Sequence, residues 1–150
     1  MKYKEEIESV ANSYNIKSAL VASVVNSESG FNENAISNKG ACGIMQIMPT
    51  TAQWVANKIG EEYSEEKLFN VAYNLKIGSY YLSYLINYFQ DEKLAICAYN
   101  AGQGNVSNWL INEEYSTDGK RLKKIPFKET EEYLNKVYKN YYYYSRKYKT

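Results

Sequence analysis

Glu28 differs from the other acidic side chains because it follows an apolar run and precedes a loop rich in Gly, Asn and Ser. It comes one helical turn after Val24, which comes one turn after Leu20, so in a helix it continues an apolar stripe. Burial disfavours the charged form of a carboxyl and raises its pKa, which keeps a proton available for general acid catalysis near neutral pH. The alternative is that Glu28 ends a helix and faces water. Periodicity alone supports both interpretations equally.

The absence of histidine removes several kinds of chemistry. Ser-His-Asp and Cys-His catalytic arrangements cannot form, and neither can an HExxH zinc site. The two cysteines, Cys42 and Cys97, are too few for a tetrahedral thiolate site. They could form one disulfide or be two buried thiols, and we favour free thiols. Acid–base chemistry must therefore come from carboxylates, tyrosines or lysines.

The loop after Glu28 has the composition of a binding segment. Gly30, Gly40 and Gly43 allow the backbone to approach a ligand closely. Gln46 follows between two apolar residues, and its amide offers donors and an acceptor suited to sugar hydroxyls and an acetamide. The alternative for Gln46 is an ordinary packed polar side chain.

The charge balance argues against a nucleic-acid-binding protein. Lys and Arg number 18 and Asp and Glu 17, which gives a formal net charge of +1 over 150 residues. A protein that neutralises many phosphates needs a larger excess of cations. The 17 tyrosines have an apolar face and a polar tip, which suits helix packing and also carbohydrate grooves. We assign most of them to helix packing.

Apolar residues recur with helical spacing almost throughout, which predicts a single all-α domain over residues 1–150. The predicted helices cover residues 3–15, 18–28, 50–60, 70–90, 93–102, 105–110 and 128–149. Ser18 and Asn105 are predicted N-caps, and Gly60 is predicted to end its helix. Gly78 lies inside a helix at a cost of about 1 kcal/mol relative to Ala, which indicates a close contact with another helix there.

Neither a secretory signal nor a membrane span is predicted. The first ten residues lack an apolar segment, and the longest apolar run, "ALVASVV", is far shorter than the roughly 20 residues that span a bilayer. As given, the chain is expected to be soluble.

Three motifs in order resemble the soluble lytic transglycosylase (SLT) family. They are "ESGFNENAISNKGACGIMQIMPTTA", "AYNAGQGNVSNW" and "IPFKETEEY", and the likeness extends from about residue 4 to residue 143. Three motifs in the right order are more specific than any one short motif. The resemblance implies a goose-lysozyme-like, all-α fold with a substrate groove, and an enzyme that cleaves peptidoglycan.

The resemblance also implies roles for individual residues. Glu28 is the catalytic acid and base, and Tyr99 hydrogen-bonds its carboxyl and orients it. The residues that the resemblance places along the sugar groove are Ser37, Met45, Gln46, Asn100, Glu131 and Tyr133. Of these, Glu131 and Tyr133 are expected at the far wall, in contact with glycan or stem peptide.

The mechanism implied by the family needs one carboxyl. Glu28 protonates the bond between MurNAc and GlcNAc, the MurNAc acetamide assists, and the 6-hydroxyl of the same sugar closes a 1,6-anhydro ring. No motif supplies a second carboxylate, and the asparagines beside Glu33 favour a solvated position for it. The expected partner is the peptidoglycan glycan strand; neither metal, cofactor nor nucleic acid is expected, and the protein is expected to be a monomer.

Two other functions remain open. A lysozyme of the same fold would need a base that activates water, and a wall-binding module without activity would not need Glu28. Because peptidoglycan lies outside the membrane, we expect an extracellular location, on the cell-wall side. Relatives with a similar start often follow a membrane segment, so we expect a catalytic domain excised from a longer, membrane-anchored or secreted protein.

Overall fold

The computed structural model describes residues 1–148. Within these residues the regular secondary structure consists of helices, without any strand. Its elements are α1 (Lys4–Ser13), α2 (Ser18–Ser29), α3 (Pro49–Ile59), the short 3-10 helix η1 (Glu66–Phe69), α4 (Val71–Phe89), α5 (Glu92–Ala101), α6 (Gln103–Leu110) and α7 (Lys128–Tyr144). The predicted all-α class is confirmed. Residue 149, at the end of the last predicted helix, lies outside the described residues.

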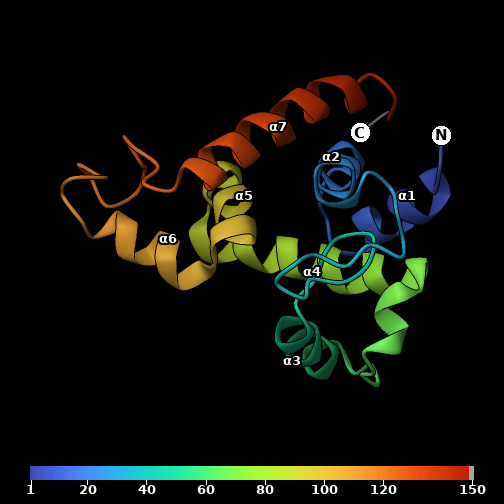
Figure 1. Ribbon diagram of the computed structural model, residues 1–150. Coiled ribbons are helices and arrows are strands. Elements are labelled where there is room, and N and C mark those ends of the chain that lie inside the picture. Colours follow the sequence, from blue (N-terminus) through green and yellow to red (C-terminus); the bar gives the residue numbers. More distant parts are fainter. Residues whose placement is uncertain (149–150) are drawn as a thin grey trace.

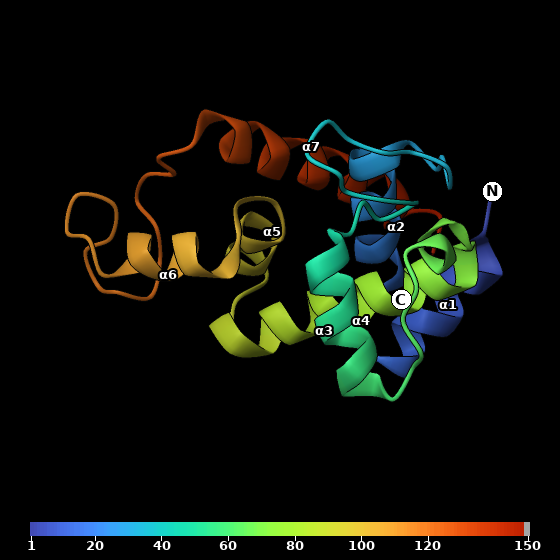
Figure 2. The same cartoon turned by 60° about the horizontal axis from the view of Figure 1, so that its bottom comes forward.

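Helix α2 lies at the centre of the molecule. It packs between α1 and α7, while α4 crosses below it and contacts α1, α3 and α5 (Figure 1). The second view agrees, with α7 on one side of the molecule and α3 and α4 on the other (Figure 2). Residues 19–25 of α2 are all buried, as expected for a helix that is apolar nearly all round. Glu28 is the only charged residue of this helix.

The helix ends follow the sequence only in part. Gly60 ends α3 with a φ of 73°, in the left-handed region that glycine adopts at low cost, so this prediction is confirmed. Ser18 is wrong as an N-cap, because α2 already begins there and its buried hydroxyl has no hydrogen-bond partner among residues 1–148. Asn105 is also wrong as a cap: it lies inside α6 and donates to the Ala101 carbonyl. A side-chain oxygen caps a helix only when its residue directly precedes the first turn.

The loop between α2 and α3 is irregular but firmly held. Two isolated antiparallel bridges, Ile36 to Cys42 and Cys42 to Ile47, fold it onto itself. The buried side chain of Asn74, on α4, accepts from the Met45 amide at 2.9 Å and donates to the Cys42 carbonyl at 3.0 Å. These bonds fasten the loop to the core, so the side chains that it carries keep fixed positions.

Two glycines allow the loop and the helix α4 to pack closely against their neighbours. Gly43 has a φ of +81°, and a Cβ there would lie 2.2 Å from the Leu68 carbonyl oxygen. A Cβ on Gly78 would lie 2.5 Å from the sulfur of Met45. The close contact predicted at Gly78 is therefore present, with a loop side chain rather than a second helix. Both cysteines are free and buried, in agreement with the prediction.

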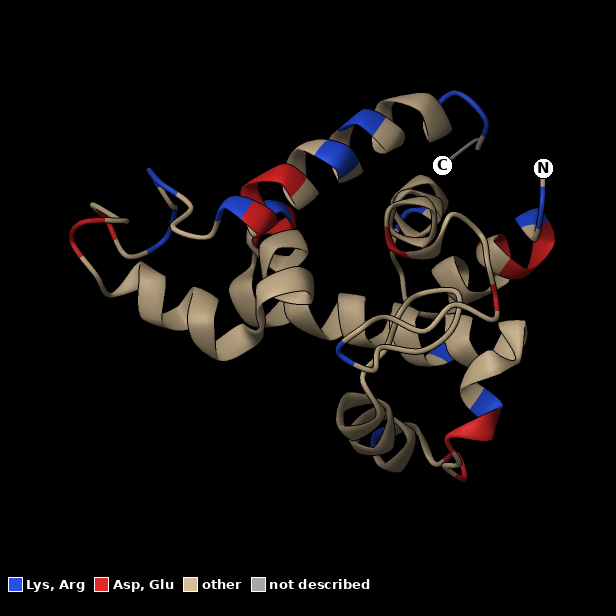
Figure 3. Ribbon diagram, viewed as in Figure 1, with Lys and Arg blue, Asp and Glu red and all other residues tan. Residues whose placement is uncertain are grey.

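The charged residues lie mostly on the outer elements. They concentrate on α1, on α7 and on the loop between α6 and α7, whereas α6 and most of α4 carry none (Figure 3). Within residues 1–148, no helix is both long and apolar enough to cross a membrane.

Candidate active site

A groove of about 400 Å³ lies where the end of α2, the following loop, the end of α5 and the start of α7 meet. Its lining residues are Glu28, Ser37, Asn38, Lys39, Ala41, Gln46, Met48, Tyr99, Asn100 and Glu129. Because α7 packs on both α2 and α5, residues from the three sequence motifs come together here. Of the predicted site residues, the groove surface includes Glu28, Ser37, Gln46, Tyr99 and Asn100.

Glu28 occupies the last turn of α2 and is partly buried, so its carboxyl meets the groove while its stem stays in the core. Burial raises the pKa of Glu28 from 4.5 to about 7. The Tyr133 hydroxyl and the Lys136 ammonium act in the opposite direction, and the Glu129 carboxylate adds to the rise. The carboxyl therefore exists in both protonation states near neutral pH, which agrees with the buried one of the two interpretations that the apolar stripe left open.

Tyr99 lies beside Glu28 but bonds elsewhere. Its hydroxyl donates to the Met45 carbonyl at 2.8 Å. In the predicted hydrogen bond between Tyr99 and Glu28, Tyr99 can therefore only be the acceptor, because a phenol has a single proton and the loop backbone takes it. Burial, followed by the nearby Glu28 charge, raises the pKa of Tyr99 well above 10.0. Its hydroxyl oxygen can still accept a hydrogen bond, including one from a protonated carboxyl.

Tyr133, unlike Tyr99, has a hydroxyl proton that no backbone carbonyl of residues 1–148 takes. Its side chain is buried, and its hydroxyl makes no hydrogen bond of standard geometry within the described residues. It nevertheless lies close enough to Glu28 to lower the pKa of that carboxyl. Since an unpaired buried hydroxyl costs about 1–3 kcal/mol, this proton is available to a nearby carboxylate. Tyr133 thus lies near the Glu28 carboxyl but does not line the groove.

Gln46 and Asn100 each offer the groove one kind of polar atom. The Gln46 amide nitrogen donates to the Ala35 and Gly43 carbonyls, which leaves its oxygen free as an acceptor. The Asn100 oxygen accepts from the Thr130 hydroxyl at 2.8 Å, which leaves its amide nitrogen free as a donor. These bonds also fix which end of each amide faces the groove.

Ser37 lies at the exposed rim of the groove. Its hydroxyl accepts from the Ala41 amide at 3.0 Å, so its own proton remains available to a ligand. Ser29, next to Glu28, donates to the Ile44 carbonyl and ties the loop to the end of α2. The acid and the loop are therefore held in one unit.

Three predicted residues do not reach the groove surface. The Met45 side chain is fully buried against Gly78, and only its carbonyl serves the site, through Tyr99. Tyr133 is buried beneath Glu28, and Glu131 is exposed without lining the groove. Met45 thus contributes its backbone carbonyl to the site, and not the side chain that the resemblance implied.

Sequence reasoning missed Glu129 and Met48, which both line the groove. Glu129 lies in the first turn of α7, two residues before Glu131. Each residue turns about 100° around a helix, so a two-residue step moves a side chain to nearly the opposite face. Glu129 is itself part of the third motif, "IPFKETEEY", and this position in the motif could have identified it. Glu33, by contrast, bonds with Tyr3 at a distance from the site.

Within residues 1–148, no three Cys, Asp or Glu side chains are grouped so that they could hold a metal ion. The arrangement offers a carboxyl that can give and take a proton near neutral pH, together with one acceptor amide, one donor amide and one hydroxyl. This set suits proton transfer to a bound, neutral, polar ligand.

Comparisons with known proteins identify the family of the chain. The family model described as "Transglycosylase SLT domain" matches residues 5–122. A soluble lytic murein transglycosylase of Salmonella typhimurium is 35% identical over 133 residues, which is 85% of this chain and 21% of that protein. The chain therefore spans about a fifth of the length of this relative.

Two solved structures have the same fold over almost the whole chain. An inactive mutant of the lytic transglycosylase Slt from Pseudomonas aeruginosa has a TM-score of 0.86 and 29% identity, covering 98% of this chain and 24% of that one. The 70 kDa soluble lytic transglycosylase of Escherichia coli has a TM-score of 0.84 and 28% identity, covering 96% and 24%. Both matches support a lysozyme-like helical domain.

Proposed function

The chain belongs to the transglycosylase SLT domain family, and we propose that it cleaves peptidoglycan as a lytic transglycosylase with Glu28 as its acid and base. One observation carries the proposal: burial raises the pKa of this groove carboxyl to about 7. A group of this pKa can give a proton in one step and take one in the next at neutral pH. The expected place of action is the cell-wall side of the membrane.

The proposed reaction has two proton transfers. Protonated Glu28 donates to the oxygen of the bond between MurNAc and GlcNAc, and this bond breaks as the MurNAc acetamide oxygen attacks the anomeric carbon. The Glu28 carboxylate then takes the proton of the MurNAc 6-hydroxyl, whose oxygen displaces the acetamide. The product is a 1,6-anhydro sugar, and Glu28 is protonated again, so no water is consumed.

The two amides of the groove fit an acetamido group. An acetamide has one N–H donor and one carbonyl acceptor, and the groove presents the Gln46 oxygen and the Asn100 amide nitrogen. We propose that they bind acetamido groups of the glycan. Each good hydrogen bond contributes about 0.5–1.5 kcal/mol, so the pair serves orientation more than affinity.

The two tyrosines fit the two protonation states of Glu28. The Tyr99 hydroxyl donates its hydrogen bond to the Met45 carbonyl, so its oxygen can accept a hydrogen bond from protonated Glu28. Tyr133 keeps an uncommitted proton that it can donate to the carboxylate. We propose that they hold the carboxyl in place through both transfers, as positioning residues.

A hydrolase is the second candidate, and Glu129 favours it. Hydrolytic glycosidases commonly use two carboxyls, one as acid and one as base or nucleophile. Glu129 lines the same groove as Glu28, so a water held between them could be activated. We favour the transglycosylase because Glu129 lies on the exposed surface, whereas Glu28 has the buried position that raises a pKa.

Mass spectrometry of digested cell wall separates the two reactions. A transglycosylase leaves 1,6-anhydro-MurNAc ends, which are lighter by one water than the reducing ends that a hydrolase leaves. Glu28→Gln should abolish cleavage in either case, while Glu129→Gln should retain anhydro products. Reducing ends, together with loss of activity in Glu129→Gln, would establish the hydrolase instead. Undiminished cleavage by Glu28→Gln would remove Glu28 from the mechanism.

A further inference from the structure

Four aromatic side chains form a continuous row beside the active site, and we call it the aromatic row: Trp54, Tyr81, Tyr84 and Tyr88. The three tyrosines are spaced by three and four residues, so they share one face of α4. Ring centroids of Tyr81 and Tyr84 lie 6.5 Å apart, those of Tyr84 and Tyr88 6.2 Å, and those of Trp54 and Tyr84 4.9 Å. The row begins next to the acid, because Tyr81 lies 5.6 Å from Tyr99.

The groove at Glu28 continues toward this row. It adjoins a second hollow of about 210 Å³, which also includes Gln46, Met48, Tyr99 and Asn100. This second hollow ends at Tyr81, on α4. The surface that binds ligand at the acid is therefore continuous with the start of the aromatic row.

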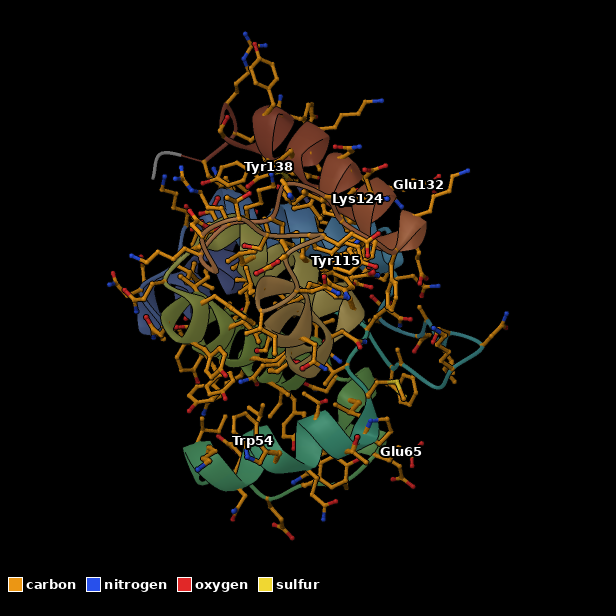
Figure 4. The ribbon with its side chains drawn as sticks, turned by 90° about the vertical axis from the view of Figure 1, so that its left-hand side faces the viewer. Trp54, Glu65, Tyr115, Lys124, Glu132 and Tyr138 are labelled. Carbon is orange, nitrogen blue, oxygen red and sulfur yellow. The ribbon has the colours of Figure 1, made fainter. Side chains whose placement is uncertain are left out.

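A third hollow extends the path. It has a volume of about 260 Å³, shares Thr51 and Tyr81 with the second hollow, and is completed by Trp54 and Gln103. It thus lies between α3 and α6, over α4. Viewed from the side on which α6 lies in front, Trp54 is found on α3 below it (Figure 4). Three connected hollows lead from the acid to the indole.

The first hollow is lined by the charged residues Glu28, Lys39 and Glu129, whereas none of the described residues that line the second and third hollows is charged. Helix α6 has no charged residue, α3 has only Lys58, and α4 has only Lys76 (Figure 3). Lys76 pairs with Glu61. The Lys58 ammonium lies 5.6 Å from the centroid of the Trp54 ring, and Lys120 and Arg121 line a separate hollow with Tyr88, at the other end of the row. An anionic polymer would need more cations, so these walls favour an uncharged ligand.

The aromatic rings are open to a ligand. In the third hollow Trp54 is 38% exposed and Tyr81 is half-buried, and covering their exposed surface is favourable. A pyranose ring has an apolar C–H face and a rim of hydroxyls. The rings match the face, and the Thr51 hydroxyl and the Gln103 amide supply polar partners for the rim.

We propose that the third hollow binds a further sugar of the glycan strand, with its ring against Trp54 and Tyr81, so that the enzyme prefers long strands. This inference rests on the proposed function, because it takes the glycan bound at Glu28 to continue along the path. Trp54 here is a specificity-determining residue remote from the reacting atoms. A short oligosaccharide fills the groove at Glu28 without reaching the indole.

The test measures binding against ligand length. Calorimetry with Glu28→Gln, which keeps ligands intact, uses GlcNAc oligosaccharides from disaccharide to octasaccharide. Affinity should rise with length, and adding Trp54→Ala should weaken the long ligands roughly tenfold, which corresponds to about 1.4 kcal/mol. The loss should be confined to ligands long enough to reach the indole, and Trp54→Phe should restore most of it.

The matched control is Tyr142→Ala, an aromatic residue on α7 that is 69% exposed and lies outside the groove and the aromatic row. It should bind every length as the parent does, and thermal unfolding of all variants checks that they fold. An unchanged length profile in Trp54→Ala, or an equal loss at all lengths, would overturn the inference. If the unmodified enzyme still leaves anhydro ends on cell wall, the proposed function survives that result. If the unmodified enzyme does not cleave cell wall but long ligands still bind through Trp54, only the proposed function would be contradicted.

Discussion

The buried position of Glu28 should make the protein less stable at alkaline pH, and replacing this one side chain should reverse the loss. The folded pKa is raised from 4.5 to about 7 by burial. The folded state then holds its proton more tightly than the unfolded state. The associated stability is fully present below pH 4.5 and is lost as the pH rises through about 7.

The size of the effect follows from the same two values. A difference of one pKa unit corresponds to 1.36 kcal/mol, so the rise from 4.5 to about 7 sets an upper limit of roughly 3.4 kcal/mol. Glu28 is only partly buried, so water reaches its carboxyl and lowers the cost to roughly 1–3 kcal/mol. Glu28→Gln has nearly the same shape and no charge, so it should escape this cost.

Urea unfolding followed by intrinsic fluorescence, at pH 4.5 and at pH 8, measures the effect. The free energy of unfolding of Glu28→Gln relative to the unmodified protein should increase by about 1–3 kcal/mol between the two pH values. Glu132→Gln is the matched control, because that side chain is exposed on α7 (Figure 4). The same relative stability of Glu28→Gln at both pH values would refute the argument that burial holds the proton on Glu28.

Other predictions concern the groups around the acid. Activity on cell wall should fall as the pH rises above about 7, because Glu28 must be protonated for the first step. Lys136→Gln removes a positive charge and Tyr133→Phe removes a hydroxyl, and both groups lower the pKa of Glu28. Each variant should therefore lose activity at a higher pH than the unmodified protein does, which a pH–rate profile would detect. An unchanged profile would contradict these contacts. Asn74→Ala should lower the free energy of unfolding by roughly 2–4 kcal/mol in urea titrations, because it leaves loop groups unpaired; a loss under 1 kcal/mol would show that the loop holds itself.

What the sequence could predict depended on local patterns. The stripe through Leu20 and Val24 correctly placed both residues in the core, because helical periodicity depends only on spacing along one chain segment, but it left open whether Glu28 was buried. The helix end at Gly60 depended on a single residue's backbone preference and was also correct. The N-caps at Ser18 and Asn105 failed because helix starts shift by one or two residues, and a cap depends on exact position.

What the sequence could not predict depended on competition between partners. The proton of Tyr99 could have gone to Glu28 or to a backbone carbonyl, and only the folded loop places the Met45 oxygen in reach. The donors of Gln46 were equally undetermined until the loop folded around them. The choice of Glu131 over Glu129 needed the orientation of α7 against α2 and α5, which no spacing within α7 contains.

These bonds explain how the fold can keep a carboxyl whose charged form is unfavourable. The acid belongs to α2, the most enclosed helix, and its neighbour Ser29 bonds to the loop that faces it. Asn74 then fastens that loop to α4 from the other side. Packing and these hydrogen bonds therefore hold the groove around Glu28, and burial raises the pKa of its carboxyl to about 7 although the Lys136 ammonium acts in the opposite direction.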